Sequence, residues 1–495
     1  MTTESNKWDS NITFIFAMIA SAIGLGNIWR YPYVLYTNGG GAFYIPYIVA
    51  LLIMAFPFLI LENALGYNYQ SSIVKAITNI KPKLQIIAWI MPIISVIIII
   101  YYSVVIGWDG IYFILSFFKG WGANSSAYFS DTLLQSSQNI ADITRLIPTV
   151  AISVIVVWIL VWTISHRNIN KGLGLLSKIM IPTLFVLIGI FVAFSLTLPG
   201  AGLGLKELFS PDWSLLLKPS IWISAFGQMF FSLSLGTGEL FTFASYTDDN
   251  VNLVSSAKYV VLGNCLFENI AAIGVFSILG NMSLTFGTPV SQLVSEGSGL
   301  LFIAYPSALN LMGIIGLVLG PLLFFMIYAA GITTLIASFE VVSSSIQDKF
   351  AISRKKATGI LCIACAALSL IFTTAPGELL LRLTDRFVND IGLILIIFIE
   401  SLIYTWIFKI DRIVNFLNFN DRYGKIWIIL VKFATPLILI IMWLGSIIQL
   451  ISEGFNNTTF IFIILSAITL ILAVISTKTP ARSKDWLKVN ERIKS

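Results

Sequence analysis

The sequence predicts an all-α integral membrane protein with twelve transmembrane helices. Hydrophobic residues make up 57% of the 495 residues, whereas charged residues make up only 11%. A soluble globular domain carries about 25% charged residues, so this composition excludes an ordinary soluble protein. Apolar runs of about 18 residues or more also recur from end to end, and each is long enough to cross a hydrocarbon core about 30 Å thick.

The apolar runs divide the chain into a membrane core and short flanking segments. The twelve predicted spans are residues 11–36, 41–69, 84–118, 147–165, 173–197, 220–246, 254–280, 312–347, 356–374, 377–408, 426–450 and 457–477. The predicted regions are an N-terminal segment (1–10), a core of ten spans (11–408), two further spans (409–477) and a basic tail (478–495).

The distribution of basic residues predicts that both termini are cytoplasmic. With the N-terminus inside, most of the 30 Lys and Arg residues fall beside the spans on the cytoplasmic side, as expected for a multi-pass protein of a cell membrane. The longest stretches between spans (119–146, 198–219 and 281–311) are then outside. The net charge of +6 is explained by contact with the lipid bilayer, and no nucleic-acid partner is expected.

Two spans contain glycines that interrupt a helix in the middle of the membrane. The first span reads SAIGLGNIWRYP (21–32) and the sixth reads FFSLSLGTGEL (230–240). Glycine inside a helix costs about 1 kcal/mol relative to alanine. Broken backbone at bilayer depth is tolerated only where it is buried in protein or lines a cavity. The sequence therefore predicts that helices 1 and 6 are unwound.

The positions of these interruptions indicate a five-plus-five inverted repeat. The two spans are five apart, so they are equivalent in two halves (about 11–197 and 220–408) that begin on opposite sides of the membrane. Inverted halves with matching broken helices are typical of transporters with a binding site near the midplane. Glycines that only let helices pack closely are the alternative, which two motifs at matching positions disfavour.

The remaining polar chemistry argues against an enzyme or a metalloprotein. Cys265, Cys362 and Cys365 all lie inside predicted spans, so no disulfide framework is expected. No His or further Cys lies near Cys362 and Cys365 to complete a metal site. His166 is the only histidine, and one histidine does not make a catalytic cluster.

Three segments resemble a known transporter family. SAIGLGNIWRYPYVLYTNGGGAFYIPY (21–47) closely resembles the first-helix signature of the neurotransmitter:sodium symporter family, including its prokaryotic leucine-transporting members. FGQMFFSLSLGTGELFTFASY (226–246) and YAAGITTLIASFE (328–340) resemble the sixth and eighth helices of that family. The resemblance covers almost the whole chain. It implies a symporter that imports a small amino acid by alternating access, driven by two bound sodium ions.

The resemblance also implies two sodium sites made of neutral oxygen atoms, which hard cations prefer. The residues of the first site would be Ala22, Asn27, Ser232 and Asn264. The residues of the second site would be Ala20, Ile23, Ala330, Thr333 and Thr334. Positions 330, 333 and 334 share one helix face by their spacing. Two adjacent threonines in a membrane helix nevertheless bond more often to their own helix.

The implied substrate site lies between the broken helices. Its residues would be Ser21, Ala22, Leu25, Gly26, Ile98, Tyr102, Phe231, Ser232, Ser234, Thr237, Thr334, Leu335 and Ser338. The substrate carboxylate would meet the N–H groups of Leu25 and Gly26 and the hydroxyl of Tyr102. Amine-transporting members carry Asp where this chain has Gly24, which favours an amino acid as substrate. Thr237 and Ser338 replace apolar residues, which favours a small substrate of mixed polarity.

Several charged residues have implied roles. Glu268 lies one helical turn after Asn264, where a carboxylate would replace the chloride ion of chloride-dependent relatives; pairing with another helix is the alternative. Arg30 and Asp385 resemble an outer gate. Tyr246 and Asp348 resemble an inner gate, although Ser5 stands where the family has a basic residue. Glu62 and Glu400 match buried glutamates with a structural role.

Three other functions fit the sequence less well. A transporter of the same fold that is coupled to protons or exchanges substrates would lack the Ala330, Thr333 and Thr334 set. A channel needs repeated filter or pore-lining segments, and none is evident. A membrane enzyme needs a cluster of His, Cys or acidic residues. The sequence leaves open which amino acid is carried, the number of sodium ions and the oligomeric state.

Overall fold

The computed structural model describes residues 7–249, 251–294, 297–408, 410–489 and 491–493. These residues form helices and no β-strand, apart from one isolated backbone bridge between Leu146 and Thr374. Within these residues, ten helical segments are long and apolar enough to span a membrane. The predicted all-α membrane fold is therefore confirmed.

The ten segments contain most of the named helices. They are Gly40–Tyr69 (with α4, Tyr44–Ala50, and α5, Phe56–Tyr69), Pro82–Ser116 (α7, Gln85–Ser116), Pro148–Ser165 (α9), Asn170–Leu196 (α10, Leu175–Leu196), Leu253–Phe286 (α14), Gly313–Phe350 (α17), Arg354–Thr373 (α18, Arg354–Ser369), Gly377–Ile407 (α19, Gly377–Phe387, and α20, Leu393–Leu402), Asp421–Ser452 (α22, Asp421–Ile429, and α23, Thr435–Ser452) and Asn457–Lys478 (α24). The shorter helices between them are α6 (Ile73–Ile80), α8 (Ser125–Ala127), α11 (Ala201–Phe209), α15 (Val290–Leu293), α16 (Tyr305–Leu311) and α21 (Asp411–Phe416).

The first predicted span is broken where the glycines indicated. Helix α1 (Asn11–Ala22) ends at Ala22 because Ile23 and Gly24 adopt extended backbone. Helices α2 (Leu25–Trp29) and α3 (Tyr31–Thr37) then continue in a direction that differs by 55° from that of α1. This bent pair is the eleventh segment that could cross the membrane.

The sixth predicted span is also interrupted. Helix α12 (Pro219–Ser232) and helix α13 (Glu239–Ala244) are separated by six residues in which Ser234, Gly236 and Gly238 have positive φ angles. A Cβ atom at Gly236 would lie 1.9 Å from the side chain of Ile397, so only glycine fits there. Neither half alone is long enough to span a bilayer, so the count of twelve spans and the inverted repeat stay predictions.

Polar residues at helix starts explain where several elements begin. The side chains of Ser10, Asn252 and Asn456 accept hydrogen bonds from backbone N–H groups in the first turns of α1, α14 and α24. Such caps satisfy donors that have no partner inside the helix. The long apolar runs that follow each cap then form helices whose faces pack against one another.

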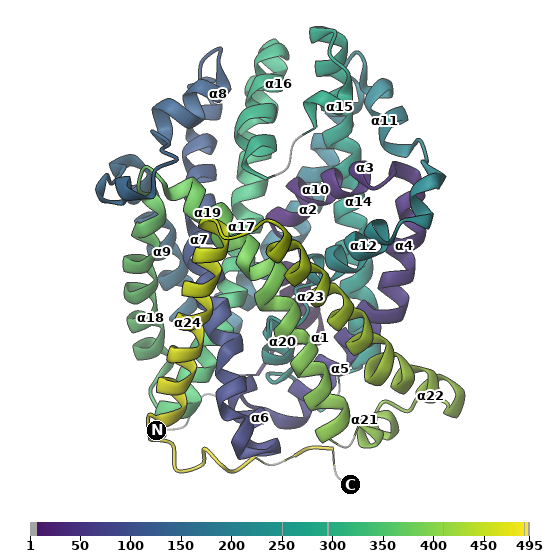
Figure 1. The fold of residues 1–495 in the computed structure, drawn as a ribbon, viewed down its shortest axis with the longest axis vertical. Coiled ribbons are helices and arrows are strands. Elements are labelled where there is room, and N and C mark those ends of the chain that lie inside the picture. Colours follow the sequence, from purple (N-terminus) through teal and green to yellow (C-terminus); the bar gives the residue numbers. More distant parts are fainter. Residues whose placement is uncertain (1–6, 250, 295–296, 409, 490, 494–495) are drawn as a thin grey trace.

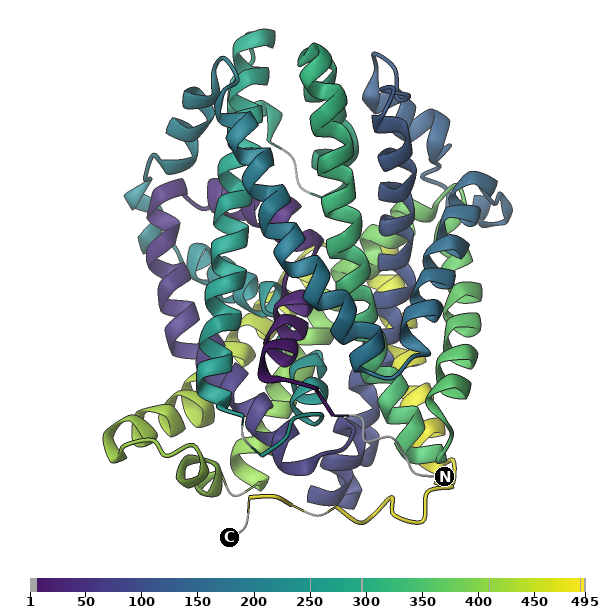
Figure 2. The ribbon, with the colours of Figure 1, turned by 180° about the vertical axis from the view of Figure 1, so that it is seen from behind.

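The broken helices lie in the middle of the bundle (Figure 1). Helix α1 packs against α10, α14 and α17, and α13 packs against α5, α1 and α17. Figure 2 shows α1, coloured purple, near the centre of the molecule when it is seen from behind. Both ends of the described chain lie at one end of the bundle, here called the terminal face, whereas α8, α11, α15 and α16 lie toward the opposite end (Figure 1).

The outer surface is apolar, as expected for contact with lipid. Large hydrophobic side chains are exposed on the peripheral helices, for example Ile152 on α9, Ile448 on α23 and Ile471 on α24. Of the ten segments, Asp421–Ser452 (α22 and α23) and Asn457–Lys478 (α24) are the least covered by protein. Exposed apolar surface of this extent is stable only against hydrocarbon.

Candidate functional site

A cluster of buried polar side chains joins the first break to α14. The amide nitrogen of Asn27 donates to Asn264 Oδ1 at 2.8 Å and lies 3.4 Å from Ser232 Oγ. The amide nitrogen of Asn264 donates to Ser232 Oγ at 2.5 Å. All three side chains are at most 2% exposed. The structure thus brings together the side chains predicted for the first sodium site, beside the Ala22 end of α1.

Glu268 closes this cluster on one side. Its Oε2 atom accepts hydrogen bonds from Ser232 Oγ at 2.6 Å and from Gln228 Nε2 at 3.3 Å. Its Oε1 atom accepts a hydrogen bond from the hydroxyl of Tyr47. The sequence reading missed both Gln228 and Tyr47. Gln228 lies four residues before Ser232 on α12, so helical spacing could have indicated it, whereas nothing in the sequence joins Tyr47 to Glu268.

The first break also contacts α17, through one threonine. The hydroxyl of Thr334 lies 3.2 Å from the carbonyl oxygen of Ile23 and 3.4 Å from that of Ala20. The hydroxyl of Thr333 instead donates to the carbonyl of Ala330 on its own helix, at 2.8 Å. The five residues predicted for the second sodium site are therefore neighbours. Only Thr334 reaches across to the broken helix.

The start of α2 lies against Tyr102 and Phe231. The N–H group of Leu25 donates to the Tyr102 hydroxyl at 3.2 Å. A Cβ atom at Gly24 would lie 3.0 Å from Thr334 Oγ1 and 3.2 Å from that hydroxyl. A Cβ atom at Gly26 would lie 2.1 Å from the ring of Phe231. The two glycines thus allow side chains of α7, α12 and α17 to approach the broken backbone.

The serine and threonine residues predicted for the substrate site come together near the second break. Ser234 Oγ donates to the Ser21 carbonyl at 3.1 Å, and Thr237 Oγ1 donates to the Ser234 carbonyl at 2.7 Å. Ser338 Oγ donates to Glu239 Oε1 at 2.5 Å. The apolar members Ile98 and Leu335 lie on α7 and α17, which pack against each other.

Two buried carboxylates flank the second break, and the sequence reading missed one of them. Glu239 is the first residue of α13 and is 1% exposed. An acidic residue in the middle of an apolar span was the signal that could have identified it. Glu62, by contrast, was predicted to have a structural role, and its Oε2 atom accepts a hydrogen bond from the N–H group of Gly236 at 3.3 Å.

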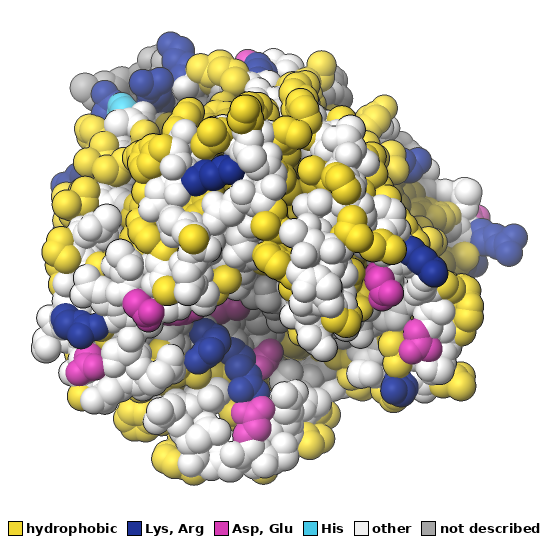
Figure 3. All heavy atoms as spheres, turned by 90° about the horizontal axis from the view of Figure 1, so that it is seen from above, with side chains coloured by type: hydrophobic (Ala, Val, Ile, Leu, Met, Phe, Trp, Pro, Cys, Tyr) yellow, Lys and Arg dark blue, Asp and Glu magenta, His cyan; other side chains and the backbone are white. Residues whose placement is uncertain are grey.

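The residues of the predicted outer gate lie near each other without an ion pair. The guanidinium of Arg30 lies over the ring of Phe231, 4.5 Å from its centroid. Asp385 accepts a hydrogen bond from the Tyr101 hydroxyl at 2.8 Å and lies within electrostatic range of Arg30. Seen from the end opposite the termini, the molecule is hollowed near its middle, and acidic and basic side chains line the hollow (Figure 3).

Tyr246 and Asp348, the residues of the predicted inner gate, have other partners. The Tyr246 hydroxyl donates to Glu340 Oε1 at 2.8 Å, and Glu340 forms two hydrogen bonds with Arg354 at 2.6 and 2.5 Å. Asp348 accepts a hydrogen bond from the Ser72 N–H group at 2.7 Å. Ser5 lies outside the described residues.

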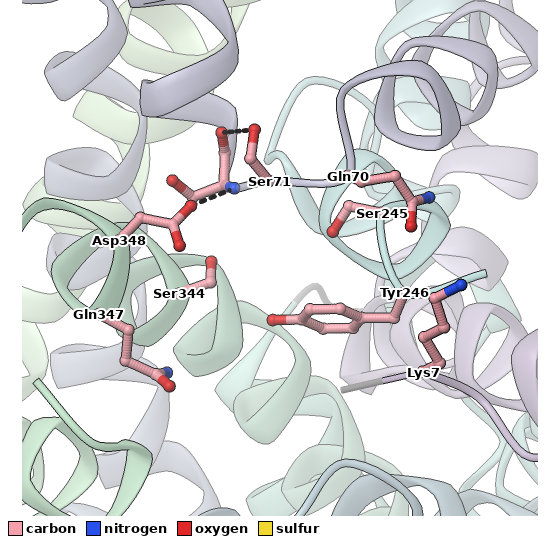
Figure 4. A pocket seen from close by; sticks show the side chains of 9 residues that line it. Lys7, Gln70, Ser71, Ser245, Tyr246, Ser344, Gln347 and Asp348 are labelled. Carbon is pink, nitrogen blue, oxygen red and sulfur yellow. Dashed lines mark hydrogen bonds between the residues drawn. The ribbon is translucent and has the colours of Figure 1, made fainter. Parts of the chain in front are cut away.

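A polar cavity of about 270 Å³ opens near the terminal face. Its lining residues are Lys7, Gln70, Ser71, Ser72, Ser245, Tyr246, Ser344, Gln347 and Asp348. Figure 4 shows Lys7 and Asp348 on opposite sides of this cavity. Lys7 forms an ion pair with Asp248 at 2.6 Å rather than with Asp348.

Within the described ranges, no three His, Cys, Asp or Glu side chains gather to hold a metal ion. The three cysteines are free thiols, and Cys362 and Cys365 are buried. The polar groups near the two breaks are mainly amides, hydroxyls and carbonyls, with the carboxylate of Glu268 beside the first break and those of Glu62 and Glu239 beside the second. Such oxygen-rich surroundings suit alkali cations and small polar solutes.

Comparisons with known proteins identify the family. The model of the sodium:neurotransmitter symporter family matches residues 5–142 and 122–481. An uncharacterized sodium-dependent transporter of Methanocaldococcus jannaschii is 38% identical over 474 residues, which cover 95% of this chain and 96% of the relative. The sodium-dependent serotonin transporter of Drosophila melanogaster is 27% identical over 89% of this chain and 76% of its own length.

Other relatives and a solved structure agree with this result. The sodium-dependent nutrient amino acid transporter 1 of Drosophila pseudoobscura pseudoobscura is 26% identical over 90% of this chain and 76% of its own length. The crystal structure of MhsT in complex with L-phenylalanine matches with a TM-score of 0.74 and 27% identity, covering 89% of this chain and 99% of that chain. The chain therefore belongs to the sodium:neurotransmitter symporter family, and it is a sodium-coupled multi-pass membrane transporter rather than an enzyme.

Proposed function

We propose that this transporter is a symporter that imports a small amino acid together with two sodium ions and needs no chloride. The observation that carries this proposal is the pairing of two broken helices with buried polar side chains. The breaks expose backbone carbonyl and N–H groups, and amide and hydroxyl groups of α14 and α17 lie beside them. Such groups can replace the water shells of small ions and of a zwitterion.

The first sodium ion would bind at Ala22, Asn27, Ser232 and Asn264. The contacts among the three polar side chains support this site, because a cation that binds there would replace hydrogen bonds among groups that are already close. The substrate carboxylate would complete its coordination. Binding of the substrate and of this ion would then be linked, because each bound ligand would make binding of the other more favourable.

The second sodium ion would bind at Ala20, Ile23, Ala330, Thr333 and Thr334. The hydroxyl of Thr334 already lies near two carbonyl oxygens of the broken helix, which supports this assignment. An ion at this point would join α1 to α17. It would therefore favour the arrangement in which the two helices are close, which is how a bound ion could control the conformation of the transporter.

An amino acid is the proposed substrate because the first break contains Gly24 rather than an acidic residue. Gly24 leaves no side chain to pair with an amine, and the Leu25 N–H group and Tyr102 hydroxyl lie where a carboxylate could accept hydrogen bonds. Two similar proteins, a nutrient amino acid transporter and a protein whose structure was solved with L-phenylalanine, support this choice.

Chloride independence is proposed from the environment of Glu268. Its carboxylate lies 3.5 Å from the amide nitrogen of Asn27 and accepts bonds from Ser232, so a fixed negative charge would stand beside the first sodium ion. A carboxylate there makes a mobile anion unnecessary for charge balance. Protonation of Glu268 during the return step would remove that charge when no sodium is bound.

The proposed cycle is alternating access in a cell membrane, with the terminal face in the cytoplasm. Two halves (about 11–197 and 220–408) would form the inverted repeat, and residues 409–477 would add two peripheral spans. Arg30 and Asp385 would close the outer side, and Tyr246 and Asp348 would belong to the inner gate. The polar cavity beside Asp348 would then lie on the cytoplasmic path.

Uptake into proteoliposomes tests this proposal. A panel of radiolabelled amino acids is offered under a sodium gradient, and sodium is replaced by potassium in a matched set. We expect uptake of at least one small amino acid only with sodium, and equal uptake when gluconate replaces chloride. Uptake driven by a proton gradient in the absence of sodium, or exchange without any ion gradient, would contradict sodium symport. Uptake that scales with chloride would contradict only the proposed role of Glu268 and would leave sodium symport intact.

A further inference from the structure

Glu239 has a carboxylate that is incompletely paired. Its Oε1 atom accepts the hydrogen bond from Ser338, whereas its Oε2 atom is buried and has no hydrogen-bond partner among the described residues. In the part of the chain that the structure describes, no Lys, Arg or His side chain forms an ion pair with it. A buried carboxylate oxygen without a partner is costly, so a group that arrives later and donates to it would bind favourably.

The surroundings of Glu239 belong to the proposed substrate site. The hydroxyl groups of Ser234, Ser21 and Thr237 lie within interaction range of the carboxylate, in addition to that of Ser338. These residues come from α1, from the break between α12 and α13, and from α17. All four belong to the predicted substrate site, here called the pocket. The carboxylate therefore lies beside residues of that pocket and not at a separate place in the bundle.

Two other buried carboxylates that are incompletely paired, Glu62 and Asp109, differ in this respect. Glu62 bonds to the backbone of Gly236. Asp109 on α7 is fully buried and has no partner for either oxygen among the described residues, but none of the four pocket hydroxyls contributes to its environment. Among these three, only Glu239 is bonded to a side chain of the proposed pocket.

An apolar substrate side chain would leave Oε2 unpaired and would place hydrocarbon against a carboxylate. A side chain that ends in a hydrogen-bond donor would instead complete the pairing. A site built to bond a polar group rejects an analogue without that group much more strongly than an apolar pocket rejects a small change in size. The expected donors are a hydroxyl group, a primary amide or an ammonium group.

We propose that Glu239 determines substrate specificity by accepting a hydrogen bond from a donor at the end of the substrate side chain. This inference rests on the proposed function, because it requires that the chain carries an amino acid. It narrows the substrate class to amino acids whose side chains carry such a donor.

Competition for uptake by the wild-type transporter in proteoliposomes tests the inference with matched pairs of amino acids. Threonine and valine have nearly the same shape but differ in one hydroxyl group, and ornithine and norleucine differ in a terminal ammonium group. We expect the donor of at least one pair to compete about tenfold better than its apolar partner, as for loss of one charge-assisted hydrogen bond. The first pair reports a neutral donor and the second a charged one.

Three variants separate recognition from a structural effect. The measured quantity is the ratio of competition by the donor to competition by its apolar partner, for each pair. Glu239→Gln removes the charge and should reduce this ratio about tenfold for the pair that the wild type discriminates, with uptake of the apolar partner retained. Glu239→Asp keeps the charge and should restore a preference for donors. Asp109→Asn is the matched control, because it removes a carboxylate that is as deeply buried as that of Glu239 but forms no hydrogen bond with a residue of the pocket. The control should leave both ratios unchanged.

Several outcomes would overturn the inference. Equal competition within both pairs by the wild type would exclude donor recognition. Equal changes of the ratios in Glu239→Gln and Asp109→Asn would indicate a general effect of buried charge. A Glu239→Gln variant that alters only the sodium or proton dependence of uptake would mean that the carboxylate serves a cation. If Glu239→Gln does not fold, the ratios of Glu239→Asp decide: an unchanged or shifted preference for donors supports the inference, and its loss contradicts it. No uptake of any amino acid by the wild type would instead contradict the proposed function.

Discussion

The hydroxyl of Thr334 on α17 lies 3.2 Å from the carbonyl oxygen of Ile23, the residue that follows the end of α1. This contact joins a continuous helix to a broken one. Its neighbour Thr333 points its hydroxyl back to its own helix. Thr334 can therefore contribute a side-chain ligand at the break directly. Thr333 would first have to give up its hydrogen bond within α17.

Thr334→Ala is expected to raise the sodium concentration for half-maximal uptake at least about tenfold, because it removes one neutral oxygen ligand from the proposed second site. Sodium titrations of uptake at fixed substrate concentration measure this. The matched control is Thr358→Ala, a buried threonine whose hydroxyl bonds to the carbonyls of Arg354 and Lys355 on its own helix. An unchanged sodium requirement in Thr334→Ala would show that the second site is elsewhere.

Glu268→Gln is expected to make uptake dependent on chloride. The variant keeps most of the shape and hydrogen-bonding capacity of the side chain, but it removes the negative charge beside Asn27. A chloride ion would then be needed to balance the first sodium ion. Uptake by the variant and by the wild type is compared in chloride and in gluconate. A variant that is equally active in both anions would contradict the proposed role of this carboxylate.

Gly26→Ala is expected to reduce uptake strongly, because its Cβ atom would lie 2.1 Å from the Phe231 ring and the ring would have to move. Arg30, which lies over that ring, would move with it. Initial rates of uptake measure the loss. Gly227→Ala on α12 is the control, since the nearest atom to its Cβ would be the Met442 methyl group at 3.7 Å.

The double variant Gly26→Ala/Phe231→Leu provides the complementary test of this contact. A smaller side chain at position 231 should make room for the new methyl group and recover part of the uptake. A double variant that is no better than Gly26→Ala would mean that the glycine is needed for its backbone conformation and not for the approach of the ring.

Arg354→Ala is expected to lower the thermal stability of the purified protein. It would leave the carboxylate of Glu340, which is 1% exposed, without its two hydrogen bonds from the guanidinium. Breaking a buried ion pair in this way typically costs about 3–5 kcal/mol. Replacing both partners, as in Glu340→Gln/Arg354→Met, should cost less because no buried charge remains. Thermal unfolding in detergent measures both, and a double variant less stable than Arg354→Ala would contradict this account.

Much of the fold follows from local properties of the chain. The apolar runs determine which segments are helices in a membrane, because backbone groups in hydrocarbon must bond within their own segment. Gly24, Gly236 and Gly238 indicate the two breaks, since glycine is least costly where a helix is unwound. The spacing of Ala330, Thr333 and Thr334 indicates one shared face of α17. The structure has the breaks at these positions.

Which side chains meet across helices was decided by the tertiary structure. Tyr246 bonds to Glu340 and not to Asp348, Arg30 lies over Phe231, and Tyr47 bonds to Glu268 across 221 positions of sequence. Ser338 and Glu239, which are 99 positions apart, meet in the same way. Such contacts depend on the rotation and depth of each helix in the bundle. Packing of all the helices together sets both, and no local pattern of residues encodes them.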